Sequence, residues 1–136
     1  MSFRDIQTAS VIDYPYLWVR EADGGLTEGR KERPTAVGVR IEKPDGDILI
    51  LFPVTTQNPG SDRIAREVPD TEKARAGLDQ DKRQWIILDE YNLDIIGQSF
   101  YLRPNSAKGR FSRAFFAPLV REALREVRRV KRVDRR

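Results

Sequence analysis

Short clusters of apolar residues, rich in β-branched and aromatic side chains, alternate with polar turns along most of this chain. Clusters of this length and composition are typical of strands, whereas helices place apolar residues at three- and four-residue steps. The segment 48–56, ILILFPVTT, is almost wholly apolar and predicts a strand buried on both faces. Together the clusters predict strands over residues 14–20, 35–43, 48–56, 64–68 and 85–88, and a weaker strand over 100–102.

Turn residues and helical periodicity supply the remaining predicted elements. Pro44-Asp45-Gly46 predicts a tight turn that joins strands 35–43 and 48–56 into a hairpin. Residues 70–76 predict a short helix that ends at Gly77. Apolar residues at three- and four-residue steps from Phe116 to Val130 predict an amphipathic helix over about 117–131, because proline at its start is tolerated in a first turn.

These elements predict a mainly-β fold: a small, partly open barrel with a short internal helix and a basic C-terminal helix. A length of 136 residues indicates one domain, which we expect to span residues 14–136. Residues 1–13 show no firm periodicity and are predicted to be a loose N-terminal lead-in. The polar stretch 21–32, which contains three glycines, is predicted to be a long functional loop.

The chain contains no cysteine and no histidine. It therefore has no disulfides, thiolate zinc sites or imidazole metal ligands, and no Ser-His-Asp or Cys-His triad. No apolar run approaches the ~20 residues that a membrane span needs, and the first residues lack the apolar segment of a signal peptide. These features predict a cytoplasmic protein that does not enter a membrane and that uses Asp, Glu, Lys, Tyr or Arg for any acid–base chemistry.

The positive charge of the chain is concentrated in its last residues. Residues 121–136 hold eight Lys or Arg and three Asp or Glu, a net charge of +5, whereas the whole chain carries +4. A polyanion is expected to meet this end first. The basic side chains are equally well explained as the solvated, frayed end of a helix, where cations also suit the helix dipole.

One pair of residues is suited to holding a phosphate. Arg33 begins the second predicted strand and Thr55 ends the third, so the hairpin places both on one rim of the sheet. A guanidinium beside a threonine hydroxyl can hold a phosphate group. No metal site is predicted, because adjacent carboxylates such as Asp89 and Glu90 point to opposite faces of a strand.

The same residues belong to a longer series of short motifs. Trp18 precedes Arg33 by fifteen positions and Glu28 precedes it by five. An Arg33-Pro34 step and a Pro53-Val54-Thr55 strand end follow, and then the segment WIILDEYN at 85–92. In this order, over residues 14–103, the chain resembles the PemK/MazF family of plasmid-maintenance and toxin–antitoxin ribonucleases, in particular a longer-tailed subgroup.

The resemblance implies an SH3-like barrel that forms a homodimer and cuts single-stranded RNA without a metal or cofactor. Attack by the ribose 2′-oxygen would be the reaction, with Arg33 stabilising the pentacoordinate phosphate and Thr55 donating a hydrogen bond to it. Glu28 or Glu90 would be the base, if one is needed, because an arginine is a poor proton acceptor. An antitoxin would be the physiological partner, an acidic segment that blocks the same groove.

The chain departs from the family pattern in one strand. Some members carry an additional arginine in the strand that corresponds to 85–88, close to a catalytic Asp, whereas here that strand is apolar. Asp89 or Glu90 could replace the acid, and Lys82 or Arg83 could replace the arginine. The predicted substrate-binding residues are Thr56, Gln57, Lys82, Arg83, Asp89 and Tyr91.

Alternative interpretations accompany this one. Trp18 and Trp85 are predicted to be core residues rather than surfaces for stacking bases, whereas Tyr91 and Phe100 are better stacking candidates. The barrel could be a non-catalytic module that binds RNA or protein. The missing strand arginine would then be a sign that catalysis is absent. The barrel could also be a structural dimer in which the C-terminal helix packs against its copy.

Overall fold

The computed structural model describes residues 2–29, 31–126 and 129–135. Their elements, in chain order, are β1 (Ser10–Tyr14), α1 (Val19–Asp23), β2 (Arg33–Ile41), β3 (Ile48–Thr55), β4 (Ala65–Glu67), α2 (Asp70–Ala76), β5 (Trp85–Ile87), β6 (Glu90–Ile95), β7 (Ala107–Arg110), α3 (Arg113–Arg125) and β8 (Lys131–Asp134). The expectation of a small, mainly-β, partly open barrel is confirmed.

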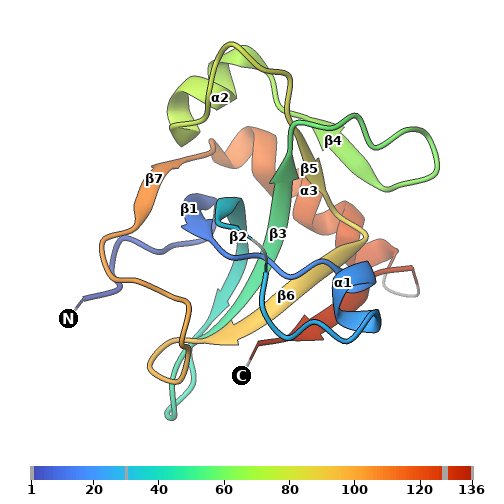
Figure 1. Cartoon of the computed structure of the whole chain (residues 1–136). Coiled ribbons are helices and arrows are strands. Elements are labelled where there is room, and N and C mark those ends of the chain that lie inside the picture. Colours follow the sequence, from blue (N-terminus) through green and yellow to red (C-terminus); the bar gives the residue numbers. More distant parts are fainter. Residues whose placement is uncertain (1, 30, 127–128, 136) are drawn as a thin grey trace.

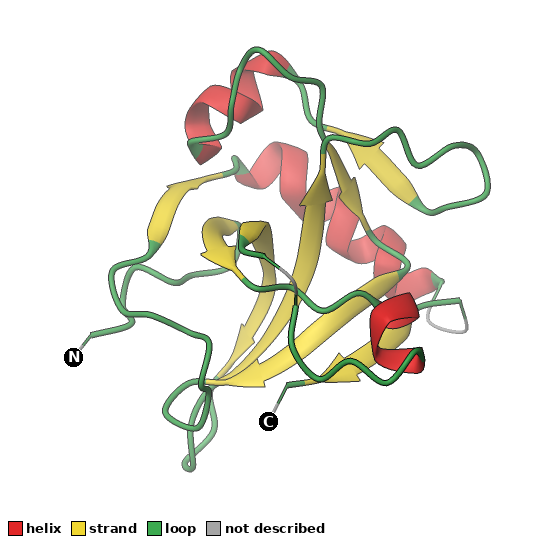
Figure 2. Ribbon diagram, viewed as in Figure 1, coloured by secondary structure: helices red, strands yellow, loops and turns green. Residues whose placement is uncertain are grey.

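The strands form one sheet in the order β4-β5-β3-β2-β1-β7. The long strand β3 is its centre: β2 pairs along one side, while β6 and β5 share the other side. The terminal strand β8 pairs with β6 in parallel, and every other pair in the described residues is antiparallel. The outer strands β4 and β7 do not pair with each other, so the described sheet does not close. Helix α3 lies behind the sheet, as Figures 1 and 2 show.

Both faces of the sheet are buried, because successive residues of a strand point to opposite faces. Phe52, Val54 and Ile86 face the side covered by α2 and α3, where Phe116 and Leu119 of α3 join the same cluster. On the opposite face a second cluster fills the inside of the barrel, including Ile12, Tyr14, Trp18, Val37, Leu49, Leu51 and Ile87. This arrangement confirms the prediction that β3 is buried on both faces and explains its nearly continuous apolar sequence.

Local signals fix the two longer helices. Helix α2 ends where Gly77 adopts a left-handed conformation with φ +72°, which is accessible to glycine at no steric cost. Helix α3 begins after Ser112, whose hydroxyl oxygen accepts a hydrogen bond from the Phe115 N–H. The N–H and hydroxyl of Ser112 in turn donate to the buried carboxylate of Glu72, both at 2.8 Å, and so join α2 to the start of α3.

A row of buried polar side chains on β6 holds the segment between β1 and α1. Glu90, Asn92 and Asp94 occupy alternate positions of β6 and are at most 5% exposed. The Tyr14 hydroxyl donates to Asp94 at 2.7 Å, and the Tyr16 hydroxyl donates to Glu90 at 3.1 Å. Between these two contacts Asn92 exchanges hydrogen bonds of 2.9 and 2.7 Å with the Leu17 backbone.

The C-terminal strand completes this row. Arg135 is 4% exposed and donates to the Asn92 side-chain oxygen at 3.0 Å and to the Pro15 carbonyl at 2.8 Å. Its guanidinium carbon lies 4.1 Å from the centre of the Tyr101 ring. Such stacking suits a guanidinium removed from water.

Several predicted boundaries were wrong. Residues 10–13 of the expected lead-in belong to β1, which pairs with β2 and β7 on either side. The predicted strand 14–20 is instead the end of β1, an extended segment and the start of α1, and α1 also occupies the first part of the expected loop 21–32. No strand forms over 100–102, whereas the strand β6 was missed.

The basic C-terminal helix is amphipathic as predicted, but it occupies other residues. It begins four positions earlier than expected, at Arg113, and ends at Arg125. Residues 131–134 form β8, because pairing with β6 satisfies their backbone groups. The expected helix positions 127–128, and residue 136 of the basic tail, lie outside the described residues. In the described ranges, no helix combines the length and apolarity needed to cross a membrane.

Asn92→Ala is expected to destabilise the protein strongly, because it leaves the buried N–H and C=O of Leu17 without partners. The expected loss is about 1–3 kcal/mol of unfolding free energy for each group left unpaired. Urea unfolding followed by circular dichroism measures it. Asn58→Ala removes the same side chain from an exposed turn and serves as the control. Equal losses in the two variants would contradict the role given to Asn92.

The buried tyrosines predict a loss of stability at alkaline pH. Burial, followed by the nearby Asp94 and Glu90 carboxylates, raises the pKa of Tyr14 and of Tyr16 above the ordinary value of 10.0. Above about pH 10 the unfolded chain loses both protons while the folded protein retains them. Unfolding free energy is therefore expected to fall with rising pH by about 1.4 kcal/mol per pH unit for each tyrosine.

Urea unfolding at several pH values above 10, with tyrosinate absorbance as a second signal, tests this expectation. Tyr14 and Tyr16 are expected to ionise only as the protein unfolds. Tyr16→Phe should reduce the pH dependence, because one buried hydroxyl has been removed. Complete titration of all four tyrosines in the folded protein would rule this out.

Candidate functional site

The structure brings Arg33 and Thr55 together at one end of the β2–β3 hairpin. Thr35 pairs with Pro53 in this antiparallel hairpin. Arg33 lies two residues before Thr35 and Thr55 two residues after Pro53, so the two stand opposite each other. Both lie on the barrel side of the sheet, because the intervening Val54 belongs to the cluster under α3. Arg33 and Thr55 line one pocket of about 200 Å³ that opens to solvent.

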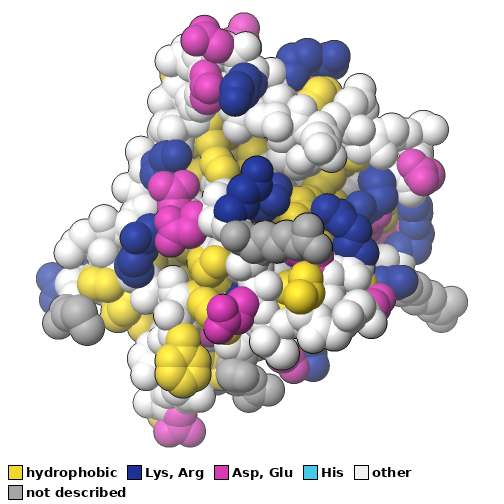
Figure 3. All heavy atoms as spheres, viewed as in Figure 1, with side chains coloured by type: hydrophobic (Ala, Val, Ile, Leu, Met, Phe, Trp, Pro, Cys, Tyr) yellow, Lys and Arg dark blue, Asp and Glu magenta, His cyan; other side chains and the backbone are white. Residues whose placement is uncertain are grey.

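The pocket has a strongly cationic lining. Arg20, Lys31, Arg33 and Arg63 all line it, and none of the described lining residues is a carboxylate. Threonine hydroxyls and side-chain amides from the end of β3 and the loop that follows add polar groups; these belong to Thr55, Thr56, Gln57 and Asn58. Figure 3 shows Lys and Arg side chains gathered in the middle and on the right of one face of the molecule. A pocket with this lining favours an anion.

Trp18 forms the apolar wall of the pocket and positions two of its arginines. The guanidinium carbons of Arg20 and Arg33 lie 4.7 and 5.1 Å from the centre of its ring. Trp18 itself is 5% exposed and packs in the barrel core, as the sequence predicted. The aromatic ring thus attracts two like charges to one place, a geometry that cation–π contacts stabilise.

Arg33 has few partners within the protein. Among the described residues no carboxylate forms an ion pair with it, and its Nε is buried without a hydrogen-bond acceptor. Burial lowers the pKa of Arg33 and nearby Arg20 lowers it further, whereas Glu21 and Tyr16 raise it. A buried donor without an acceptor is costly. An anion in the open pocket would be the charge partner that the described residues do not give the Arg33 guanidinium.

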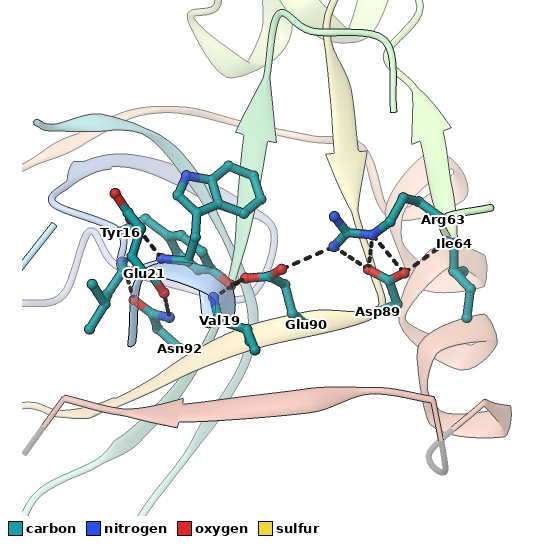
Figure 4. A network of polar contacts seen from close by, with 10 residues as sticks. Tyr16, Val19, Glu21, Arg63, Ile64, Asp89, Glu90 and Asn92 are labelled. Carbon is teal, nitrogen blue, oxygen red and sulfur yellow. Dashed lines mark hydrogen bonds and ion pairs between the residues drawn. The ribbon is translucent and has the colours of Figure 1, made fainter. Parts of the chain in front are cut away.

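Arg63, unlike Arg33, forms ion pairs with two carboxylates. Its Nε and Nη2 bind Asp89 at 2.6–3.0 Å, and Nη2 also donates to Glu90 at 3.0 Å (Figure 4). The hydrogen bonds to Asp89 raise the pKa of Arg63 most. Asp89 also accepts the Ile64 N–H at 3.2 Å, so the loop before β4 is fixed to the turn between β5 and β6.

The predicted substrate-binding residues fall into three groups. Thr56 and Gln57 line the pocket with Arg33 and Thr55. Asp89 lies behind Arg63, beside the candidate base Glu90, and both carboxylates line a neighbouring hollow that shares Arg20 and Arg63 with the pocket.

The others lie elsewhere. The Arg83 guanidinium pairs with Glu67 and stacks on Trp85, outside the pocket lining, and Lys82 is exposed beside it. Tyr91 packs edge-on against Phe52, beside the cluster under α3.

The two candidate bases are also placed by the structure. Glu90 is 5% exposed and its carboxylate accepts hydrogen bonds from Tyr16, Arg63 and the Val19 N–H. Glu28 is exposed and does not line the pocket. The geometry therefore gives Glu90 a structural task and leaves Glu28 outside the group of residues around Arg33.

The sequence interpretation did not include Arg20, Lys31 or Arg63 in the site. Arg20 and Lys31 stand in charge-rich segments where no single cation is distinguished. Arg63 precedes the short strand β4, and only the non-local contact with Asp89 identifies it. Arg63 supplies a guanidinium next to an acidic residue, the combination that the sequence of strand 85–88 lacked.

Comparison with protein-family models, with curated proteins and with solved structures found no match to this chain. Among the described residues, no three His, Cys, Asp or Glu side chains are grouped so that they could hold a metal ion. The candidate site therefore rests on the geometry of its own residues, and its metal independence stays a prediction.

Inorganic phosphate is expected to bind in this pocket and to change the NMR signals of the Arg33 guanidinium group, because no carboxylate among the described residues forms an ion pair with it. Arg33→Ala should abolish saturable phosphate binding, measured by NMR titration of the surrounding amides. Arg83→Ala, which removes an arginine outside the pocket, is the control and should bind normally. Unchanged binding by Arg33→Ala would show that the anion binds elsewhere.

Proposed function

We propose that this protein is the toxin component of a toxin–antitoxin system, a metal-independent endoribonuclease that cuts single-stranded RNA in the cytoplasm. The observation that supports this most is the placement of Arg33, without an ion pair among the described residues, beside Thr55 in a pocket lined by cations. That pocket matches the needs of a scissile phosphate, whose negative charge increases on attack.

RNA carries its own nucleophile, so the protein mainly has to position and stabilise the reacting phosphate. The ribose 2′-oxygen attacks phosphorus, the bond to the 5′-oxygen of the next nucleotide breaks, and a 2′,3′-cyclic phosphate forms. Arg33 donates to the phosphate oxygens as their charge grows. The Thr55 hydroxyl oxygen accepts a hydrogen bond from the Gln57 N–H at 3.1 Å. The hydroxyl can therefore donate its own hydrogen to a phosphate oxygen.

Proton transfer in this scheme does not use the two glutamates. Glu90 is buried and its carboxylate accepts hydrogen bonds from three donors, and Glu28 lies outside the pocket lining. The proton of the 2′-hydroxyl therefore passes to solvent, and the departing 5′-oxygen takes a proton from solvent. Arg63 stays paired with Asp89 and Glu90 and keeps the pocket wall in position.

The resemblance to PemK/MazF toxins supports the biological part of the proposal. It is carried by the Arg33-Pro34 and Pro53-Val54-Thr55 steps, whose side chains Arg33 and Thr55 line the same pocket. On this basis we propose that the active form is a homodimer and that an antitoxin protein restrains it. Expression of the protein alone would then stop cell growth.

A second candidate function is RNA binding without cleavage. It is favoured because no carboxylate stands among the described residues of the pocket lining, whereas many ribonucleases use a protein group as general base. Such a module would bind single-stranded RNA through the same cations, and its affinity would fall steeply as salt is added.

Arg33→Ala is expected to reduce RNA cleavage by about a hundredfold or more, because it removes a donor that contacts the phosphate in the transition state. Cleavage of a labelled single-stranded RNA is measured with EDTA present, and circular dichroism confirms that the variant is folded. Arg83→Ala is the matched control and should cleave at the normal rate. Thr55→Val, which removes one hydroxyl, should give an intermediate loss.

The assay also separates the two candidates. Salt-sensitive binding by the wild-type protein without any product would favour the binding module. Equal cleavage by the wild type and Arg33→Ala would exclude the proposed phosphate site. Growth inhibition by both proteins to the same extent would exclude the proposed toxin mechanism.

A further inference from the structure

A second concave surface lies on another part of the molecule, between α3, β2 and the residues around the start of β1. It is a groove of about 750 Å³, and none of its described lining residues belongs to the pocket around Arg33. Its floor is apolar and includes Val39 of β2 and Phe116, Ala117 and Val120 of α3. The mechanism proposed above uses none of these residues.

Arginines surround this floor on several sides. Arg75, Arg110, Arg113 and Arg121 line the groove, and its described lining includes no carboxylate. Among the described residues no Asp or Glu forms an ion pair with Arg110, Arg113 or Arg121, and the contact of Arg75 with Glu72 is long, at 3.8 Å. Arg113 and Arg121 are about 12 Å apart along α3, at 1.5 Å per residue. The positive charge is therefore spread along the groove rather than collected at one end.

The aromatic residues of the floor cannot stack with nucleic-acid bases. Phe111 and Phe116 are 3% and 1% exposed, and their rings stack on each other with centres 5.6 Å apart. Base stacking needs an open ring face. What the groove offers is aliphatic surface and ring edges, which suit inserted apolar side chains.

Strand β2 has a free edge beside the groove. Its pairing with β1 ends at Ala36, and the Ala9 N–H bond to the Val37 carbonyl is the last backbone contact on that side. A bulge at Gly38 follows. Among the described residues no strand pairs with β2 on this side beyond Val37. An extended chain can add to such an edge through backbone hydrogen bonds.

We propose that this groove binds an extended acidic peptide segment whose apolar side chains enter the floor and whose carboxylates pair with the arginines. A second copy of the chain fits less well, because an interface with two-fold symmetry would place the two sets of arginines together. Single-stranded RNA fits less well because the aromatic faces are sealed. The proposal does not depend on the nuclease activity proposed above.

The test uses the whole protein and a short, fluorescently labelled peptide that alternates Glu and Leu. Fluorescence anisotropy is expected to show saturable binding. Arg113→Glu with Arg121→Glu should weaken it at least about tenfold, because two attractive contacts become repulsive. Lys43→Glu with Lys82→Glu is the matched control: it changes the net charge equally at exposed sites outside the groove and should bind normally.

Two further peptides separate specific binding from charge attraction alone. A peptide that alternates Glu and Ser should bind much more weakly, and one that alternates Lys and Leu should not bind. Thermal unfolding and retained phosphate binding at Arg33 show that the double variant is folded.

The proposal is overturned by equal affinity of the groove variant and its control, or by equal affinity for the Glu-Leu and Glu-Ser peptides. It is also overturned if single-stranded RNA displaces the peptide from the wild-type protein and binds more weakly to the variant Arg113→Glu with Arg121→Glu. Dimerisation that is abolished by the groove variant, measured by sedimentation, would assign the surface to a second copy instead.

Discussion

The buried hydrogen bonds between β6 and the segment 14–19 hold the candidate site in place. Glu90, Asn92 and Asp94 point inward from one strand and bind Tyr16, the Leu17 backbone and Tyr14. Buried polar groups are costly unless every one is paired, so this row admits only one alignment of the segment. That alignment sets Trp18 beneath Arg20 and Arg33, and thereby shapes the anion pocket.

The charges around the pocket serve two different purposes. Arg63 is neutralised by Asp89 and Glu90, so it joins the loop before β4 to the β5–β6 turn. Arg33 has an aromatic ring beside it instead of a paired carboxylate, and its charge remains available to a ligand. Arg33 is half-buried and its Nε has no acceptor among the described residues, which destabilises the folded state. Its retention at the rim of the barrel is the kind of local cost that functional sites carry.

The two concave surfaces of the molecule differ in chemistry. The pocket around Arg33 is small and lined by cations, hydroxyls and amides, which suits a compact anion such as a phosphate. The groove beside α3 is larger and combines an apolar floor with arginines along its length. One surface therefore recognises charge density, and the other recognises an extended chain with both acidic and apolar side chains. The two surfaces have no lining residue in common among those that the structure describes.

The sequence by itself determined the features that depend on neighbours in the chain. The β2–β3 hairpin, helix α2 with its Gly77 end and the meeting of Arg33 with Thr55 all follow from a local turn and strand periodicity. Only the tertiary structure decided the rest. Strand β6 was missed because its inward residues Glu90, Asn92 and Asp94 are polar, and they become core residues only when the segment 14–19 and Arg135 supply their partners. Arg63 and the parallel strand β8 likewise depend on contacts between residues far apart in the chain, which no local pattern records.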